Sequence, residues 1–121
     1  MFTVTVQTSF TAGHQLTMPD GRVEQLHEHN WVVRSAVAAE KLDESGLVAD
    51  FHWLETKIKE VVSPLDGARL EELACFEDVN ASAENVAKYI YDKLEPLLPG
   101  RVKMQYVEVS EAPDCWAKYS G

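Results

Sequence analysis

The sequence has little positive charge and no long apolar run, and each shortage excludes a class of protein. Eleven lysines and arginines stand against twenty aspartates and glutamates in 121 residues, so the formal net charge is −9. A nucleic-acid-binding domain needs a basic surface to release phosphate counterions, and this composition provides none overall. No run of about 18 apolar residues is present, so we expect no membrane span.

Cysteine is also scarce. Cys75 and Cys115 are the only two, which allows one disulfide at most. The first ten residues, MFTVTVQTSF, alternate polar and apolar side chains and lack the basic and then apolar segments of a signal peptide. We therefore expect a cytoplasmic protein with two free thiols.

Glycine and proline, six and five residues, separate segments of regular periodicity. Polar and apolar residues alternate over residues 2–10 and again over 26–40, which predicts two long strands. Trp31, Val33 and Val37 share one face of the second strand. A polar, turn-rich stretch at 17–25 joins the two strands, so we expect an antiparallel hairpin.

Helical spacing of apolar residues begins after Asp50, which suits the N-cap of a helix that ends at Ser63-Pro64. A second helix is predicted over 83–94, with Ser82 as its N-cap. Two further strands follow these helices.

The predicted strands at 102–111 and 115–119 complete the order ββααββ. The chain 1–121 is then a single α+β domain, with a four-stranded antiparallel sheet that carries two helices on one face. Such a sheet leaves its edge strands exposed, and continuation of the sheet into neighbouring subunits would cover them. The pattern therefore favours a homo-oligomer.

The histidines are the strongest indication of chemistry. His27 and His29 lie two residues apart on a strand, so both point to one face, and the hairpin brings His14 alongside. Three imidazoles with one open position are typical of catalytic zinc. A surface pair with a distant third histidine is the alternative. His52, in a first helical turn beside Trp53, suits an ordinary surface position.

Five short motifs, in order along nearly the whole chain, resemble those of the 6-pyruvoyltetrahydropterin and 6-carboxytetrahydropterin synthases. The motifs are F-x-A-x-H, L-H-G-H-N, G-x-V-x-D-F, T-x-E-N and E-T-x5-A-x-Y. Their counterparts here are Phe10-Thr11-Ala12-Gly13-His14, Leu26-His27-Glu28-His29-Asn30, Gly46-Leu47-Val48-Ala49-Asp50-Phe51, Ser82-Ala83-Glu84-Asn85, and Glu111 with Ala117 and Tyr119.

The resemblance implies that His14, His27 and His29 bind zinc. It also implies the T-fold, whose sheets join between subunits into a barrel, commonly as a hexamer of two trimers with active sites between subunits. The implied function is that of a zinc-dependent lyase acting on the C6 side chain of a dihydropterin, 7,8-dihydroneopterin or its triphosphate. Glu111 is expected to anchor the pterin ring, and Ser82 also belongs to the expected substrate-binding set.

Three positions depart from the pattern. Val23 stands where the family has its general-base cysteine, and Gly67 stands where a histidine follows Asp66. Glu28 replaces the glycine between the two ligand histidines, and its side chain should point away from them. A paralogue that binds zinc and a pterin without turnover is therefore the alternative function.

Glu24 offers a replacement base. The segment from Glu24 to His29 is similar to the E-x-x-H-G-H signature of a subgroup that cleaves the dihydroneopterin side chain to 6-hydroxymethyl-7,8-dihydropterin. We expect Glu24 and Asp66 to be the catalytic residues. Cys115 and His52 are the alternative bases, and a solvated loop position for Glu24 and a turn role for Asp66 are the structural alternatives.

Overall fold

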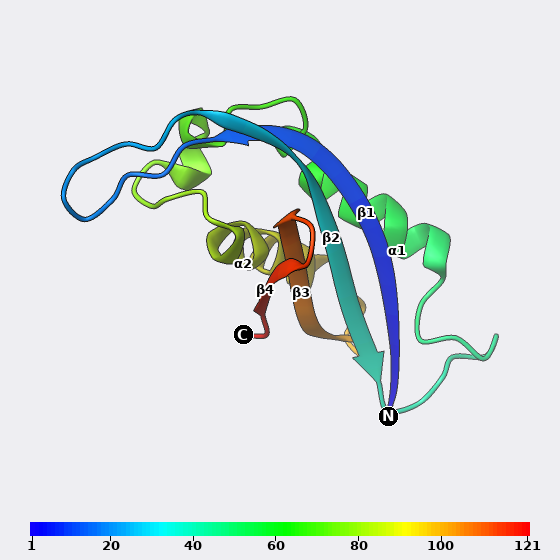
Figure 1. Cartoon of the computed structure of the whole chain (residues 1–121). Coiled ribbons are helices and arrows are strands. Elements are labelled where there is room, and N and C mark those ends of the chain that lie inside the picture. The colour runs from blue at the N-terminus through cyan, green and yellow to red at the C-terminus, as the bar shows by residue number, and fades with distance from the viewer.

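Two long strands, β1 (Phe2–His14) and β2 (His27–Ala39), form the predicted hairpin in the computed structural model, which describes residues 1–121. They pair antiparallel over their whole length, from Phe2 opposite Ala39 to His14 opposite His27. β1 therefore continues four residues beyond the end that alternation predicts, and His14 is its last residue. In Figure 1 the hairpin is a long curved ribbon that arches over the rest of the molecule.

Strands β3 (Lys103–Ala112) and β4 (Cys115–Tyr119) complete the sheet. The strand order is β1-β2-β3-β4 and every neighbouring pair is antiparallel. The pairing of β3 with β2 shifts where Met104 faces Val37 and Tyr106 faces Ala36, so Gln105 is an extra residue that makes a bulge.

The two helices are α1 (Phe51–Val62) and α2 (Ala83–Leu94), as predicted. The Asp50 side chain accepts hydrogen bonds from the first backbone N–H groups of α1, and Ser82 accepts one from the Asn85 N–H of α2. Four short 3₁₀ turns were not predicted. They are Ser63–Leu65, Leu70–Glu72, Ala74–Phe76 and Glu95–Leu97.

The core lies between one face of the sheet and the two helices. α1 packs along β1, and α2 packs against β3 and β4 (Figure 1). Trp31, Val33 and Val37 are fully buried there, as the alternation predicts, and belong to one core cluster with Leu54 of α1 and Ile90 of α2. The expected ββααββ architecture is confirmed.

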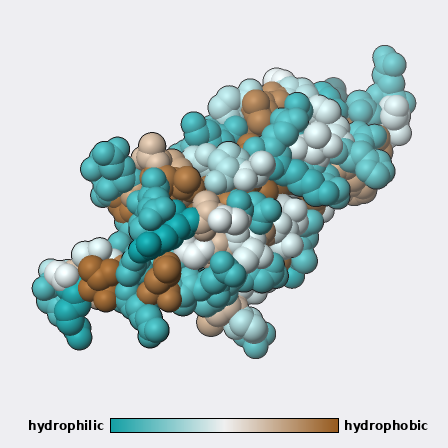
Figure 2. All heavy atoms as spheres, turned by 90° about the horizontal axis from the view of Figure 1, so that it is seen from above, coloured by the Kyte–Doolittle hydropathy of each residue, from teal (hydrophilic) through white to brown (hydrophobic).

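The surface seen from above in Figure 2 is mostly hydrophilic, with small, separate groups of apolar side chains. Cys75 and Cys115 are both exposed and unpaired, as expected. None of the helices combines the length and the apolar character that crossing a bilayer requires.

Candidate metal centre

The stem of the hairpin brings three histidines to one point. His14 and His27 are direct partners across β1 and β2, and His29 lies two residues further on β2, on the same face. The ring centroids of His14 and His27 are 4.4 Å apart, those of His27 and His29 are 4.6 Å apart, and those of His14 and His29 are 5.6 Å apart. The pairing register thus produces the expected convergence.

Backbone carbonyls orient two of these rings. Nδ1 of His14 lies 2.8 Å from the carbonyl oxygen of Ala81, and Nδ1 of His27 lies 2.9 Å from that of Gln25. Since a carbonyl only accepts, each Nδ1 is the donor, and each Nε2 of a neutral ring keeps a free lone pair. Metal-binding histidines are typically held in this way by their second nitrogen.

A fourth side chain, that of Glu111, lies with the histidines, although the sequence spacing did not predict this contact. Oε2 of Glu111 lies 2.6 Å from Nε2 of His14. The His14 side chain is 1% exposed and that of Glu111 is 29% exposed. Ligand atoms of His14, His27, His29 and Glu111 all lie within 4.8 Å of one another. The β2–β3 pairing, in which Val32 faces Ser110, is the feature that brings residue 111 to this end of the sheet.

This donor set fits a metal ion. Three imidazole nitrogens and one carboxylate oxygen are ligands that zinc accepts. Burial, and then the neighbouring His27, lower the pKa of His29, while Glu111 and Glu24 act in the opposite direction. A lowered pKa favours the neutral imidazole that a metal requires. The cluster could therefore bind a metal ion.

Glu24 lies in the hairpin loop close to this cluster. Its side chain is half-buried, its Oε1 accepts a hydrogen bond from the Leu16 N–H at 3.1 Å, and its charge acts on His29. Val23 beside it is 55% exposed and pairs with Thr17. The loop thus holds a carboxylate near the histidines through a backbone contact.

Asp66 lies on the surface, outside the histidine cluster. Its Oδ1 accepts a hydrogen bond from the Thr11 N–H at 3.0 Å, and the side chain is exposed rather than grouped with the histidines. The next residue, Gly67, has φ +73°, a left-handed conformation that favours glycine. Within one chain, Asp66 therefore fixes the turn beside β1.

Ser82 lies close to the metal cluster, because the carbonyl of the preceding residue, Ala81, accepts the hydrogen bond from His14. Its hydroxyl caps α2, accepting from the Asn85 N–H at 3.2 Å. His52 is exposed at the start of α1, where its backbone N–H is capped by Asp50. Neither side chain is among the grouped ligands.

A cavity of about 370 Å³ opens beside Glu111. Glu111 is thus shared between the metal cluster and this cavity, and Cys115 lies on the cavity wall. The remaining lining residues are Ala83, Glu84, Trp116, Ala117 and Lys118.

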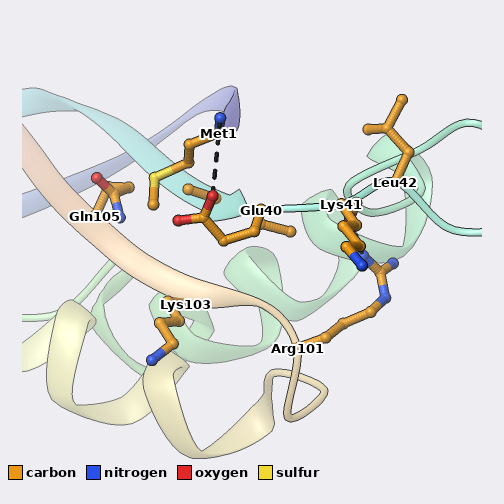
Figure 3. A pocket seen from close by; sticks show the side chains of 9 residues that line it. Met1, Glu40, Lys41, Leu42, Arg101, Lys103 and Gln105 are labelled. Atoms are coloured by element: carbon orange, nitrogen blue, oxygen red, sulfur yellow. Dashed lines mark hydrogen bonds and ion pairs between the residues drawn. The ribbon is translucent and has the colours of Figure 1, made fainter.

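A second cavity, of about 490 Å³, lies at the opposite end of the hairpin (Figure 3). Ala39 in its wall is twelve residues from His27, roughly 40 Å along an extended strand. The Arg101 guanidinium in this wall bonds the carbonyls of Lys41 and Val48, and so holds the loop after β2. This cavity is separate from the histidine cluster.

Comparison with known proteins agrees with this geometry. A family model described as 6-pyruvoyl tetrahydropterin synthase matches residues 3–121. A 6-carboxy-5,6,7,8-tetrahydropterin synthase from Synechocystis is 32% identical over 98% of this chain and 93% of the relative. A dihydroneopterin monophosphate aldolase from Pyrococcus furiosus is 30% identical over 87% of this chain and 85% of the relative.

The fold has a close counterpart among solved structures. The 6-pyruvoyl tetrahydropterin synthase of Caenorhabditis elegans superposes with a TM-score of 0.86 at 24% identity, covering 99% of this chain and 95% of that one. The match of the family model to almost the whole chain, together with the expected motifs and architecture, leads to one conclusion. The chain belongs to the 6-pyruvoyl tetrahydropterin synthase family.

Proposed function

We propose that the protein is a zinc-dependent lyase that acts on the C6 side chain of a dihydropterin, 7,8-dihydroneopterin or its triphosphate. The observation that carries this proposal is the convergence of three imidazoles and a carboxylate within 4.8 Å, where the carboxylate, that of Glu111, also lines a cavity of about 370 Å³. Membership of a family whose named relatives are pterin enzymes supports the substrate class.

His14, His27 and His29 would hold the zinc ion. The carbonyls of Ala81 and Gln25 support this role, because they fix the tautomers of two rings before a metal arrives. Zinc bound there would polarise substrate oxygens and so make the neighbouring O–H and C–H groups more acidic.

Glu111 and Ser82 would contact the substrate. Glu111 lies in the cavity wall, and a carboxylate can accept two parallel N–H bonds from the amino-pyrimidine edge of a pterin. Ser82 begins α2, whose first residues, Ala83 and Glu84, line the same cavity.

Glu24 would be the general base, because Val23 has no group that can move a proton. The half-buried carboxylate of Glu24 lies near enough for its charge to act on His29. Asp66 would assist from a neighbouring subunit, in a homohexamer built as a dimer of trimers. The unpartnered edges of β1 and β4 support such an assembly.

A second function, binding of zinc and a pterin without turnover, is favoured by two residues. Val23 and Gly67 lack the thiol and imidazole that the resembling enzymes use for proton transfer. The metal cluster and the cavity would serve a binding protein equally well.

Product analysis distinguishes the two functions. Zinc-loaded protein would be incubated with 7,8-dihydroneopterin and, separately, with its triphosphate, and the products separated by chromatography. We expect stoichiometric zinc and a product with an altered C6 side chain, such as 6-hydroxymethyl-7,8-dihydropterin. The similarity to the Pyrococcus dihydroneopterin monophosphate aldolase is the reason to include that standard. Zinc and pterin binding without any product would favour the second function.

A further inference from the structure

Two buried atoms at the metal centre lack hydrogen-bond partners although they lie side by side. Nε2 of His14 and Oε2 of Glu111 are 2.6 Å apart, yet neither has a hydrogen bond of acceptable geometry. Buried polar atoms are almost always paired, and a buried carboxylate without a partner is costly. This contact therefore calls for a group that is not part of the chain.

The tautomer of His14 defines what that group must be. Since Nδ1 donates to the Ala81 carbonyl, Nε2 of the neutral ring presents a lone pair to Glu111. The carboxylate oxygen is also an acceptor, so two lone pairs face each other. A cation between them would satisfy both.

No side chain supplies this cation. The Glu111 carboxylate contacts Nε2 of His14, and no lysine or arginine pairs with it. A lysine on the cavity wall, Lys118, pairs instead with Glu108 at 3.7 Å. His27 and His29 complete the cluster, and their imidazole nitrogens lie within the same 4.8 Å as the other ligand atoms.

We propose that Glu111 is the fourth ligand of the metal ion while the substrate is absent. The inference rests on the three-histidine site proposed above. With metal–ligand bonds of about 2.0–2.1 Å, two ligand atoms of a tetrahedral ion lie roughly 3.3 Å apart. The Glu111 side chain would therefore shift by less than about 1 Å from its present position to share the ion with His14.

Such a ligand changes the chemistry of the resting site. Four protein ligands close a tetrahedral zinc centre, whereas catalysis needs an open position. Because Glu111 also lines the cavity, the substrate oxygens would have to displace the carboxylate from the metal. The position would then be open only in the substrate complex.

Titration with Co²⁺ in place of zinc tests this inference by visible absorption, independently of activity. We expect the parent protein to give the intense bands of a four-coordinate ion. Glu111→Gln should bind Co²⁺ about 10-fold or more weakly, the range seen when groups that support a metal site are removed, and its bands should change. Glu111→Ala provides a second variant, and circular dichroism checks that both fold.

Two controls are needed. One tests whether the loss of any nearby negative charge changes the spectrum, and the other tests whether the metal site exists at all. Glu24→Gln removes another carboxylate whose charge acts on His29, and it should leave the Co²⁺ spectrum unchanged. A parent protein that binds no Co²⁺ would overturn the metal site itself. If the parent binds Co²⁺ and His27→Ala does not, but both Glu111 variants keep the parent's affinity and spectrum, the three-histidine site stands and Glu111 is not a ligand.

Discussion

The side chain of Glu24 makes one hydrogen bond, which a glutamine can also make. Its Oε1 accepts from the Leu16 N–H, and an amide oxygen is an equally suitable acceptor. Glu24→Gln therefore keeps the local contact and removes only the basicity. If Glu24 is the general base, this variant should turn over dihydroneopterin about 10²–10⁴-fold more slowly with unchanged zinc content.

Glu28 supplies the matched control for that measurement. It is exposed on the opposite face of β2 from His27 and His29, so Glu28→Gln should keep the parent rate. Equal rates for the parent and Glu24→Gln would contradict the assignment, and Cys115 on the cavity wall would be the next base to test.

The histidine site was predictable because strand geometry is local. Residues two apart on a strand share a face, and a hairpin brings its two ends together, so spacing favoured a site of His14, His27 and His29. A surface pair with a distant third histidine remained the alternative until the motif resemblance favoured the site. The contact of Glu111 with His14 joins residues 97 positions apart. It depends on how β3 pairs with β2, and local periodicity does not specify that register.

Among the elements, α2 begins beside the metal cluster, so the residues that stabilise its first turn also lie next to the site. Ser82 caps this helix, and the neighbouring carbonyl of Ala81 holds His14. Ser82→Ala removes an N-cap hydroxyl, so the free energy of unfolding should fall by about 1 kcal/mol in a denaturant titration. Ser82→Asp should retain most of this stability, because aspartate is an equally good cap.

The same pair of variants separates capping from substrate binding. If the Ser82 hydroxyl contacts the pterin, both variants should raise KM, although only the alanine variant loses stability. Asp50→Ala removes the cap of α1 and should cost a similar free energy at unchanged KM. An unchanged KM in Ser82→Asp would leave Ser82 with its capping role alone.

Element boundaries were predictable where a period or a cap marks them. Asp50 and Ser82 stand immediately before the first helical residues, and both helices begin where these caps indicate. The end of β1 was placed four residues early, because the large apolar side chains end at Phe10 and Gly13 breaks the alternation, while the backbone still pairs with β2 as far as His14. The 3₁₀ turns between Ser63 and Phe76 are too short to produce a period.

For the molecule as a whole, the two edges of the sheet are the feature that lacks strand partners within a single chain. β1 is thirteen residues long and has a strand partner on one side only, as does β4. Long exposed edges favour pairing with another chain. We expect light scattering to give about 82 kDa, six copies of the 13.6 kDa chain, and a stable monomer would contradict the hexamer.

Mixed oligomers test whether Asp66 serves the site of a neighbouring subunit. His27→Ala should remove the metal site, whereas Asp66→Asn keeps an oxygen for the Thr11 N–H and loses only the charge. Each variant alone should have little activity. The two variants would be refolded together in equal amounts. If neighbouring subunits share a site, about a quarter of the sites then combine an intact His27 with an intact Asp66. About a quarter of the parent activity should therefore return. No gain on mixing would mean that each chain contributes its whole site, and full activity of Asp66→Asn alone would leave Asp66 with only its turn role beside β1.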